Sequence, residues 1–163
     1  MAYHDDLLEL AIDLICRVPR VPAQVNQATL RRAVSTAYYA LFHLLISETV
    51  ANWSRASSRD ALGRMFDHGL MKRVSSRVLD ANKVPLKGED PVVVRNLRAV
   101  SKAFALLQDQ RHIADYDNAT SWAETEALLV VSMAEEAFAT WRLIRNENIA
   151  QNYLVSLLIK PRD

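Results

Sequence analysis

The sequence predicts an all-α fold, an antiparallel four-helix up-and-down bundle with additional terminal helices. Three observations favour this fold class. Glycine and proline are scarce, with three and five in 163 residues. Alanine, leucine, arginine and glutamate, which favour helices, are abundant. No alternating hydrophobic pattern with turn chemistry predicts a β-hairpin.

The first two helices are expected on either side of a proline-containing stretch. One helix begins near Asp5, and two prolines in "RVPRVPAQ" (17–24) must interrupt it. Asn26 is a good N-cap for a long helix over about 27–53. Ser57 or Ser58 then caps a helix that runs to about Leu79, with weak points at its two glycines.

The second half of the chain carries clear start signals. The stretch 81–91 is a loop that ends in Asp90-Pro91, a cap followed by a first-turn proline, so a helix is expected over about 91–113. The sequence "DYDNAT" breaks it. Ser121 and Glu124 form the pattern of a capping box, which predicts a helix from there to about Asn146. The apolar run 153–159 is compatible with a helix or a strand.

Composition narrows the class of protein. The length fits a single domain over residues 1–163. A net charge of only +1 argues against a strongly basic nucleic-acid binder, although a local patch can still bind RNA. A single cysteine excludes an internal disulfide. The acidic start, and a neutral stretch (33–47) too short and polar to span a bilayer, predict a cytoplasmic protein with no membrane anchor.

The most unusual stretch is "RRAVSTAYYALFHLLISE" (31–48), in which polar groups interrupt an otherwise uncharged helix. At about 100° per residue, Arg32, Thr36, Tyr39 and His43 share one side of the helix. Small residues on the flanks allow close helix packing. Two interpretations stay open: Tyr39 and His43 are buried polar groups bonded to a neighbouring helix, or the stripe lines a cleft.

This stretch resembles the signature helix of HEPN-domain proteins, in which an Arg-x-x-x-Ser/Ala-x-x-Tyr-Tyr-Ala-x-Phe-His pattern is typical. Arg31, Ser35, Tyr38, Tyr39, Ala40, Phe42 and His43 match it. Two further segments, "FDHGLMKRV" (66–74) and "LLQDQRHIADYDN" (106–118), resemble later landmarks of the family. The resemblance covers about residues 30–118 and is closest to the small stand-alone bacterial and archaeal HEPN proteins.

The resemblance implies a helical bundle that usually forms a homodimer. Family members include RNA-cleaving toxins and partners of minimal nucleotidyltransferases. In the nucleases, an arginine followed four to six residues later by a histidine meets its copy at the dimer cleft. The histidine acts on the ribose 2′-hydroxyl and the arginine stabilises charge on the phosphate, without a metal.

This sequence departs from that motif at its essential residue. The matching arginine is Arg111, but positions 116, 117 and 118 hold Tyr, Asp and Asn. A tyrosine, with an ordinary pKa of about 10 against about 6.5 for histidine, is a poor replacement for the base. His112 points about 100° away from Arg111 on a helix. His43 is the remaining candidate, if it reaches the same cleft.

The candidate site therefore contains Arg111 and His43 as catalytic residues, and Arg32, Tyr39, Asp115 and Tyr116 as a binding groove. Arg111 and Asp115 are also at the spacing of an ordinary helical ion pair. Arg64 and His68 repeat a shorter Arg-x-x-x-His pattern, for which an exposed helical face is the expected explanation. No metal-ligand spacing, glycine-rich phosphate loop or Gly-x-Ser-x-Gly turn is present, so no metal or cofactor is expected.

Three functions stay open. The leading expectation is a HEPN-like protein of RNA- or nucleotide-linked stress or defence, acting as half of a toxin–antitoxin-like pair with a nucleotidyltransferase. The second is a non-catalytic dimeric protein-interaction module, which the missing histidine favours. The third is a metal-independent endoribonuclease with His43 as its general base.

Overall fold

The computed structural model describes residues 2–16, 26–82 and 86–159. Within these ranges the chain forms seven α-helices and one short 3₁₀ turn, and no strand. The helices are α1 (Tyr3–Cys16), α2 (Gln27–Ala51), α3 (Arg59–Gly63), α4 (His68–Val78), α5 (Pro91–Tyr116), α6 (Glu124–Ile144) and α7 (Asn148–Ser156). The all-α prediction is therefore confirmed. The two prolines predicted to interrupt the first helix fall in 17–24 and lie outside the described residues.

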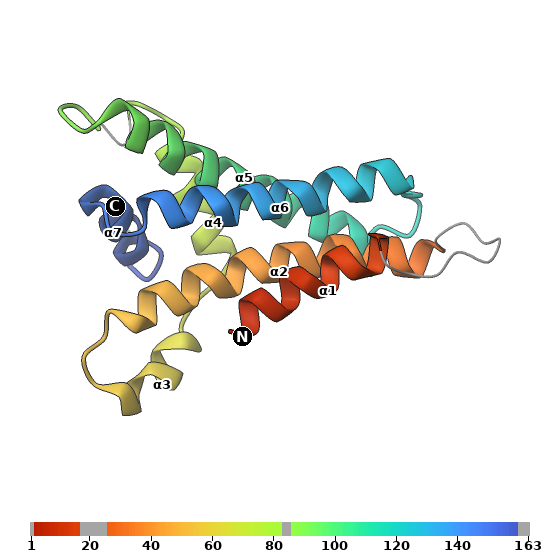
Figure 1. Cartoon of the computed structure of the whole chain (residues 1–163), viewed down its shortest axis with the longest axis horizontal. Helices are drawn as coiled ribbons and strands as arrows, with labels where there is room; N and C mark the ends of the chain where they lie inside the picture. The colour runs from red at the N-terminus through yellow and green to blue at the C-terminus, as the bar shows by residue number, and fades with distance from the viewer. Residues whose placement is uncertain (1, 17–25, 83–85, 160–163) are drawn as a thin grey trace.

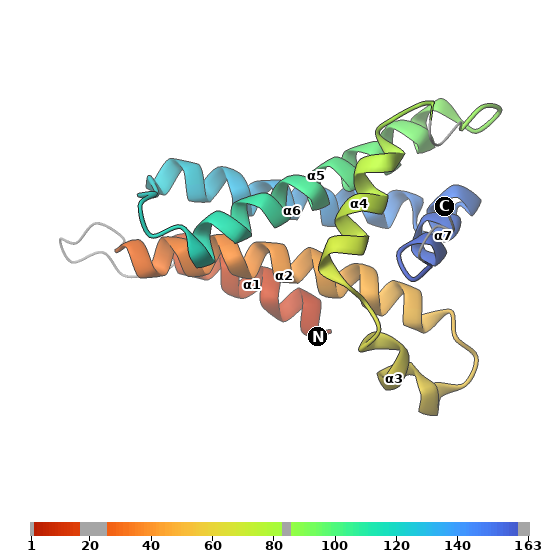
Figure 2. The same ribbon diagram turned by 180° about the vertical axis from the view of Figure 1, so that it is seen from behind.

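The long helices α2, α5 and α6 contact one another, and α1 packs against both α2 and α6 (Figure 1). Successive members of this set run in opposite directions along the long axis of the molecule (Figure 1). Figure 2 shows α4 crossing α5 on the face turned away from α1. Helix α4 therefore approaches the central helices from a side that α1 leaves open.

Helix α2 is the centre of the core. Its buried residues lie around most of its circumference, because α1, α5 and α6 enclose it. Ala33, Ala37 and Ala40 are completely buried, and their small side chains let neighbouring helices approach closely. Thr36, predicted to share a stripe with Tyr39, is also buried. Thr36 is thus placed between helices rather than in solvent.

Two predicted helix starts are confirmed by their caps. The Asn26 side chain accepts from the backbone N–H of Thr29 at 2.9 Å, at the start of α2. Asp90 accepts from the N–H of Val92 at 2.7 Å, with Pro91 as the first residue of α5. Both caps use the short side-chain oxygen that a helix start requires. These helices could therefore be placed from local sequence alone.

Two other predictions were wrong in detail. The helix expected from Ser57 or Ser58 to Leu79 is divided into the 3₁₀ turn at 56–58, α3 and α4, because the chain leaves the helix after Gly63 and Asp67 starts a new one. The N-cap of α6 is Ala123, not Ser121: the carboxylate of Glu126 accepts from the N–H of Ala123 at 2.9 Å, and the alanine has no side-chain oxygen to complete a capping box.

The remaining differences concern helix ends. Helix α5 continues to Tyr116, three residues beyond the predicted end, and Asp117 terminates it by accepting from the N–H of Ala119 and the hydroxyl of Thr120. The apolar run near the end of the chain contributes to helix α7, so the strand alternative is wrong. Nowhere in the described ranges is a helix both long and apolar enough to cross a membrane.

Candidate functional site

Arg111 on α5 lies among three tyrosine rings. Its guanidinium donates to the hydroxyl of Tyr39 at 2.6 Å, and its Nε lies 2.7 Å from a carboxylate oxygen of Asp115. The carbon of the guanidinium is 5.3 Å from the ring centre of Tyr39, 5.4 Å from that of Tyr116 and 6.0 Å from that of Tyr38. These are distances at which a cation is attracted to an aromatic face.

Arg111 stays positively charged although its side chain is only 17 % exposed. Burial lowers its pKa, but the hydrogen bond to Tyr39 and the charge of Asp115 raise it further, so the pKa lies above its ordinary value. The ion pair with Asp115, expected from the i, i+4 spacing, is present. Arg111 is therefore a fixed cation whose charge is already partly balanced.

His68, the first residue of α4, reaches the same cluster from a different helix. Its Nδ1 lies 2.6 Å from the hydroxyl of Tyr38, and its ring stacks on Phe42 with 4.2 Å between the ring centres. Burial lowers the pKa of His68, and the positive charge of Arg111 lowers it further. The imidazole is therefore neutral near pH 7.

Tyr38 fixes the orientation of that imidazole. The Tyr38 side chain is completely buried, and burial raises the pKa of its hydroxyl far above the ordinary value. A hydroxyl that keeps its proton can donate to Nδ1 of His68. The hydrogen of the neutral ring then resides on Nε2, which makes Nε2 the nitrogen that can donate to a ligand.

His43 lies one turn of α2 beyond Tyr39. Its ring meets the ring of Tyr3, on α1, edge to face at 4.9 Å, and its centre is 6.4 Å from that of Tyr39. Burial lowers the pKa of His43, and the nearby imidazoles of His68 and His4 lower it further. A neutral imidazole at this position is able to accept a proton.

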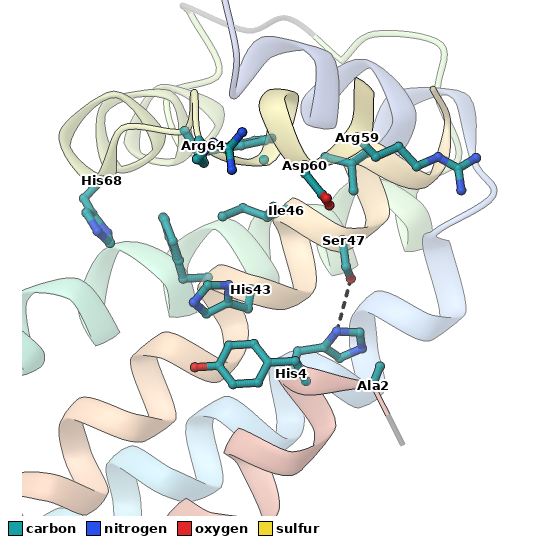
Figure 3. Close-up of a pocket in the computed structure, with 14 residues that line it drawn as sticks. Ala2, His4, His43, Ile46, Ser47, Arg59, Asp60, Arg64 and His68 are labelled. Carbon is teal, nitrogen blue, oxygen red and sulfur yellow. Dashed lines mark hydrogen bonds between the residues drawn. The ribbon is translucent and has the colours of Figure 1, made fainter. Parts of the chain in front are cut away.

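His43 and His68 line one open cavity of about 640 Å³, which Figure 3 shows. The cavity is formed by the first turn of α1, the second half of α2, α3 and the start of α4. Its polar lining consists of Tyr3, His4, His43, Ser47, Arg59, Asp60, Arg64 and His68. Three of the four histidines of the chain are in this set. His4 is held there by a 3.1 Å hydrogen bond to the hydroxyl of Ser47.

The predicted site residues fall into two neighbouring groups. Tyr39, Arg111, Asp115 and Tyr116 lie together, as their placement in one groove requires. His43 lines the cavity, whereas Arg111 and Tyr39 are not among the described residues that line it. Tyr39 and Phe42 lie between the two groups, because each has a ring contact with both His43 and His68.

Arg32 takes no part in either group. It is exposed on α2, whereas its neighbour Arg31 turns toward the end of α5. Arg31 donates to the carbonyl oxygens of Ala114 at 2.8 Å, Asp117 at 2.8 Å and Thr120 at 2.6 Å. Arg31 therefore fixes the backbone next to Asp115 and Tyr116, a role that the helical wheel did not reveal.

The prediction that Arg64 and His68 lie on an exposed helical face was wrong for His68. Arg64 is exposed and follows α3, whereas His68 is half-buried at the start of α4. A local signal existed, because Asp67 is a good N-cap and places His68 in the first turn of a new helix. The contact with Tyr38 depends on how α4 crosses α2, which local sequence does not encode.

The described residues contain no cluster of three His, Cys, Asp or Glu side chains arranged to hold a metal ion. No family model, curated protein or solved structure matches the chain. The likeness of α2 to the HEPN signature helix therefore stays a resemblance. The contacts of Arg111, His43 and His68 are what a functional proposal must explain.

Proposed function

We propose that this chain is a cytoplasmic HEPN-like protein that acts in RNA- or nucleotide-linked stress or defence. In this proposal the helices constitute an antiparallel four-helix up-and-down bundle with additional terminal helices. The bundle forms a homodimer and is one half of a toxin–antitoxin-like pair with a nucleotidyltransferase. The signature-like sequence on α2 supports the family, and Arg111 on α5 supports binding of a phosphate group.

The observation that carries the proposal is the environment of Arg111. A guanidinium that is fixed by Tyr39 and Asp115 and flanked by tyrosine rings is preorganised to meet a phosphate oxygen. Tyr116 is 63 % exposed beside it and offers a ring on which a base can stack. One cation and one exposed ring are the minimum that RNA or a nucleotide needs.

A non-catalytic interaction module is the second candidate. Asp115 lies close enough to Arg111 to balance its charge, which weakens attraction for phosphate. Positions 116, 117 and 118 contain no histidine. In this case the aromatic groove would hold a protein partner, for which tyrosine and arginine are well suited.

The third candidate, a metal-independent endoribonuclease, depends on His43. The lowered pKa of His43 supports a base that is neutral near pH 7. Its ring lies next to Tyr39, which itself bonds Arg111. In this reading His43 would accept the proton of a ribose 2′-hydroxyl, and Arg111 would stabilise the negative charge on phosphorus.

One experiment separates these candidates. Purified protein is incubated with mixed RNA in EDTA, and binding and cleavage are measured for the native chain and for Arg111→Ala and His43→Ala. The controls are Arg77→Ala and His112→Ala, which remove an exposed side chain of the same type. Cleavage that both site variants lose and both controls keep would establish the nuclease.

The other outcomes are equally decisive. RNA or nucleotide binding without cleavage, weakened by Arg111→Ala and by added salt, would support the HEPN-like proposal in its non-nuclease form. Absence of binding and cleavage at high protein concentration would refute the RNA-linked proposal and favour the interaction module. Light scattering tests the homodimer, and co-purification tests the nucleotidyltransferase partner.

A further inference from the structure

The cavity lined by His43 and His68 has features that the Arg111 groove does not need. It brings side chains of the first turn of α1 to one space with side chains of the consecutive segment 42–68, which covers the second half of α2, α3 and the start of α4. Figure 3 shows Arg64 above His43, with His68 to one side and His4 to the other. Two arginines, Arg59 and Arg64, thus share the cavity with three imidazoles.

Arg64 is available to a ligand. Among the described residues it makes no hydrogen bond or ion pair, and it is exposed at the rim. Arg59 also lines the cavity, but it donates to the carbonyl oxygens of Trp53 at 3.0 Å and Ala51 at 3.2 Å. Arg59 therefore contributes charge, whereas Arg64 can rotate to hold an anion directly.

The charge of the lining increases when an anion enters. While His43 and His68 are neutral, the positive charges of Arg59 and Arg64 are opposed by the carboxylate of Asp60. His43 faces Tyr3 and His4 on α1 and Tyr39 on its own helix, and the imidazoles of His68 and His4 oppose its protonation. An anion placed between the imidazoles would stabilise their protonated forms. The cavity therefore gains positive charge when the anion binds.

The groups around His68 have opposite effects on the protonation of its ring. Arg111 on α5 opposes protonation of His68, whereas Asp67 at the start of α4 favours it. Its Nδ1 is turned toward Tyr38. The neutral ring keeps Nε2–H as a donor to an anion, and the protonated ring strengthens that bond.

The rest of the lining is apolar and aromatic. Phe42, Ile46, Val50 and Phe66 contribute carbon surface, together with the ring of Tyr3. Simple inorganic ions would leave this surface uncovered. A ligand that combines a doubly charged group with an aromatic or apolar group would cover both parts.

We propose that this cavity binds a phosphate monoester carried on an aromatic or apolar group, and that binding takes up protons on His43 and His68. Arg64 and the imidazoles hold the phosphate, and the aromatic walls cover the attached group. A free small-molecule ester and the 5′-phosphate end of an RNA strand share this chemistry. Arg111 does not line the cavity, but His68 lies beside both, so Arg64 is the residue that tests this site alone.

The primary test is titration calorimetry with phenyl phosphate at pH 7.5, in two buffers with different ionisation enthalpies. The proposal expects saturable binding with net proton uptake. The phosphate is almost fully dianionic at this pH, because its second pKa is about 6, so proton uptake reports the protein. Phenyl sulfate, which has the same ring and one charge, is expected to bind at least about tenfold more weakly.

Variants identify the side chains. Arg64→Gln should weaken phenyl phosphate binding about tenfold or more, whereas Arg77→Gln, an equal change of charge on an exposed part of α4, should leave it unchanged. His43→Gln and His68→Gln should each reduce the proton uptake, and His112→Gln should not. Thermal melts establish whether each variant is folded. If a histidine variant does not fold, Arg64→Gln still tests the proposal, because Arg64 is exposed.

Several results would overturn the proposal. These are no binding, equal binding of phosphate and sulfate esters, no proton uptake, or equal losses in Arg64→Gln and Arg77→Gln.

A matched pair of RNA strands with a 5′-phosphate or a 5′-hydroxyl distinguishes the two sources of the phosphate monoester. Preference for the phosphorylated strand assigns the RNA end, and equal binding of both strands with retained phenyl phosphate binding assigns a small molecule. Loss of RNA binding in Arg111→Ala with retained phenyl phosphate binding would assign the RNA contact to Arg111 and support a separate phosphate site in the cavity.

Discussion

The hydroxyl of Tyr39 has a specific task that its neighbours on α2 do not share. It accepts from Arg111, and the ring also lies 5.3 Å below the guanidinium carbon. A phenylalanine would keep the ring contact and lose only the acceptor. The two contributions can therefore be separated by one substitution.

Tyr39→Phe is expected to lower the free energy of unfolding by about 1 kcal/mol, because a hydrogen bond to a charged, largely buried donor is lost. Tyr116→Phe is the matched control: this ring also lies near Arg111, but the residue is mostly exposed and its hydroxyl makes no hydrogen bond within the described ranges. Urea denaturation measures both. Equal effects of the two substitutions would show that the Tyr39 hydroxyl contributes nothing.

His68 links stability to pH. Its pKa in the folded state is lowered, first by burial and then by Arg111, whereas the unfolded chain has the ordinary value of about 6.5. Below that value the unfolded state binds more protons than the folded state, so stability falls as pH falls. His43 acts in the same direction for the same reason. The native chain should therefore lose stability between pH 7.5 and pH 5.5.

Replacing His68 by glutamine should make this loss smaller, even if the variant is less stable at every pH. Urea denaturation at a series of pH values gives the slope directly. His112→Gln removes an exposed histidine of α5 and should leave the slope as in the native chain. A slope that His68→Gln does not change would mean that other groups produce the pH dependence.

Residue-level prediction succeeded where two groups share a helix. The pair formed by Arg111 and Asp115 follows from a spacing of four, and Tyr116 is the next residue after Asp115 on the same helix. It failed where the partner comes from another helix. Nothing in the spacing of "FDHGL" indicates that His68 meets Tyr38, because that contact depends on how α4 packs against α5 beside α2.

Helix α4 depends on its first residues. The carboxylate of Asp67 accepts from the N–H of Leu70 at 2.7 Å, and His68 follows immediately. The cap thus determines both where the helix begins and where His68 stands. A weakened cap would allow the first turn to fray and would release the imidazole from Tyr38.

Asp67→Ala is expected to destabilise the protein by about 1 kcal/mol, as loss of an N-cap does. Asp67→Asn keeps a capping oxygen and should cost much less. Chemical denaturation gives the stability, and the NMR signals of the His68 ring report whether the imidazole becomes more mobile in Asp67→Ala alone. Equal stability of the alanine and asparagine variants would show that the cap is dispensable.

Helix starts were likewise predicted correctly where the signal is local and wrongly where another helix takes part. Asn26 and Asp90 cap helices that need only the next few residues to form, and both were found from sequence. The prediction of Ser121 as the N-cap was wrong. The pair Ala123 and Glu126, which the structure uses, lies only two residues after the predicted pair Ser121 and Glu124. Bonding of Trp122 to Gln27 on α2 favours the later start.

At the scale of the whole molecule, Arg31 joins the start of α2 to the connection between α5 and α6. It spans 83 to 89 residues of sequence through three carbonyl acceptors. Two of these acceptors surround the end of α5, next to Asp115 and Tyr116. The backbone beside the residues around Arg111 is therefore held by a contact made from outside that cluster.

Arg31→Ala should lower the free energy of unfolding by about 2 kcal/mol, since several charged hydrogen bonds to the backbone are lost together. It should also loosen the end of α5, which faster amide exchange at residues 114–118 would show. Arg32→Ala removes the same charge from the next position, where the side chain is exposed, and should change stability by less than about 0.5 kcal/mol. Because the two variants share composition and helix, a difference between them can only come from the carbonyl contacts. Equal stabilities would mean that water replaces Arg31 at all three carbonyls, and that the connection between α5 and α6 holds its shape without α2.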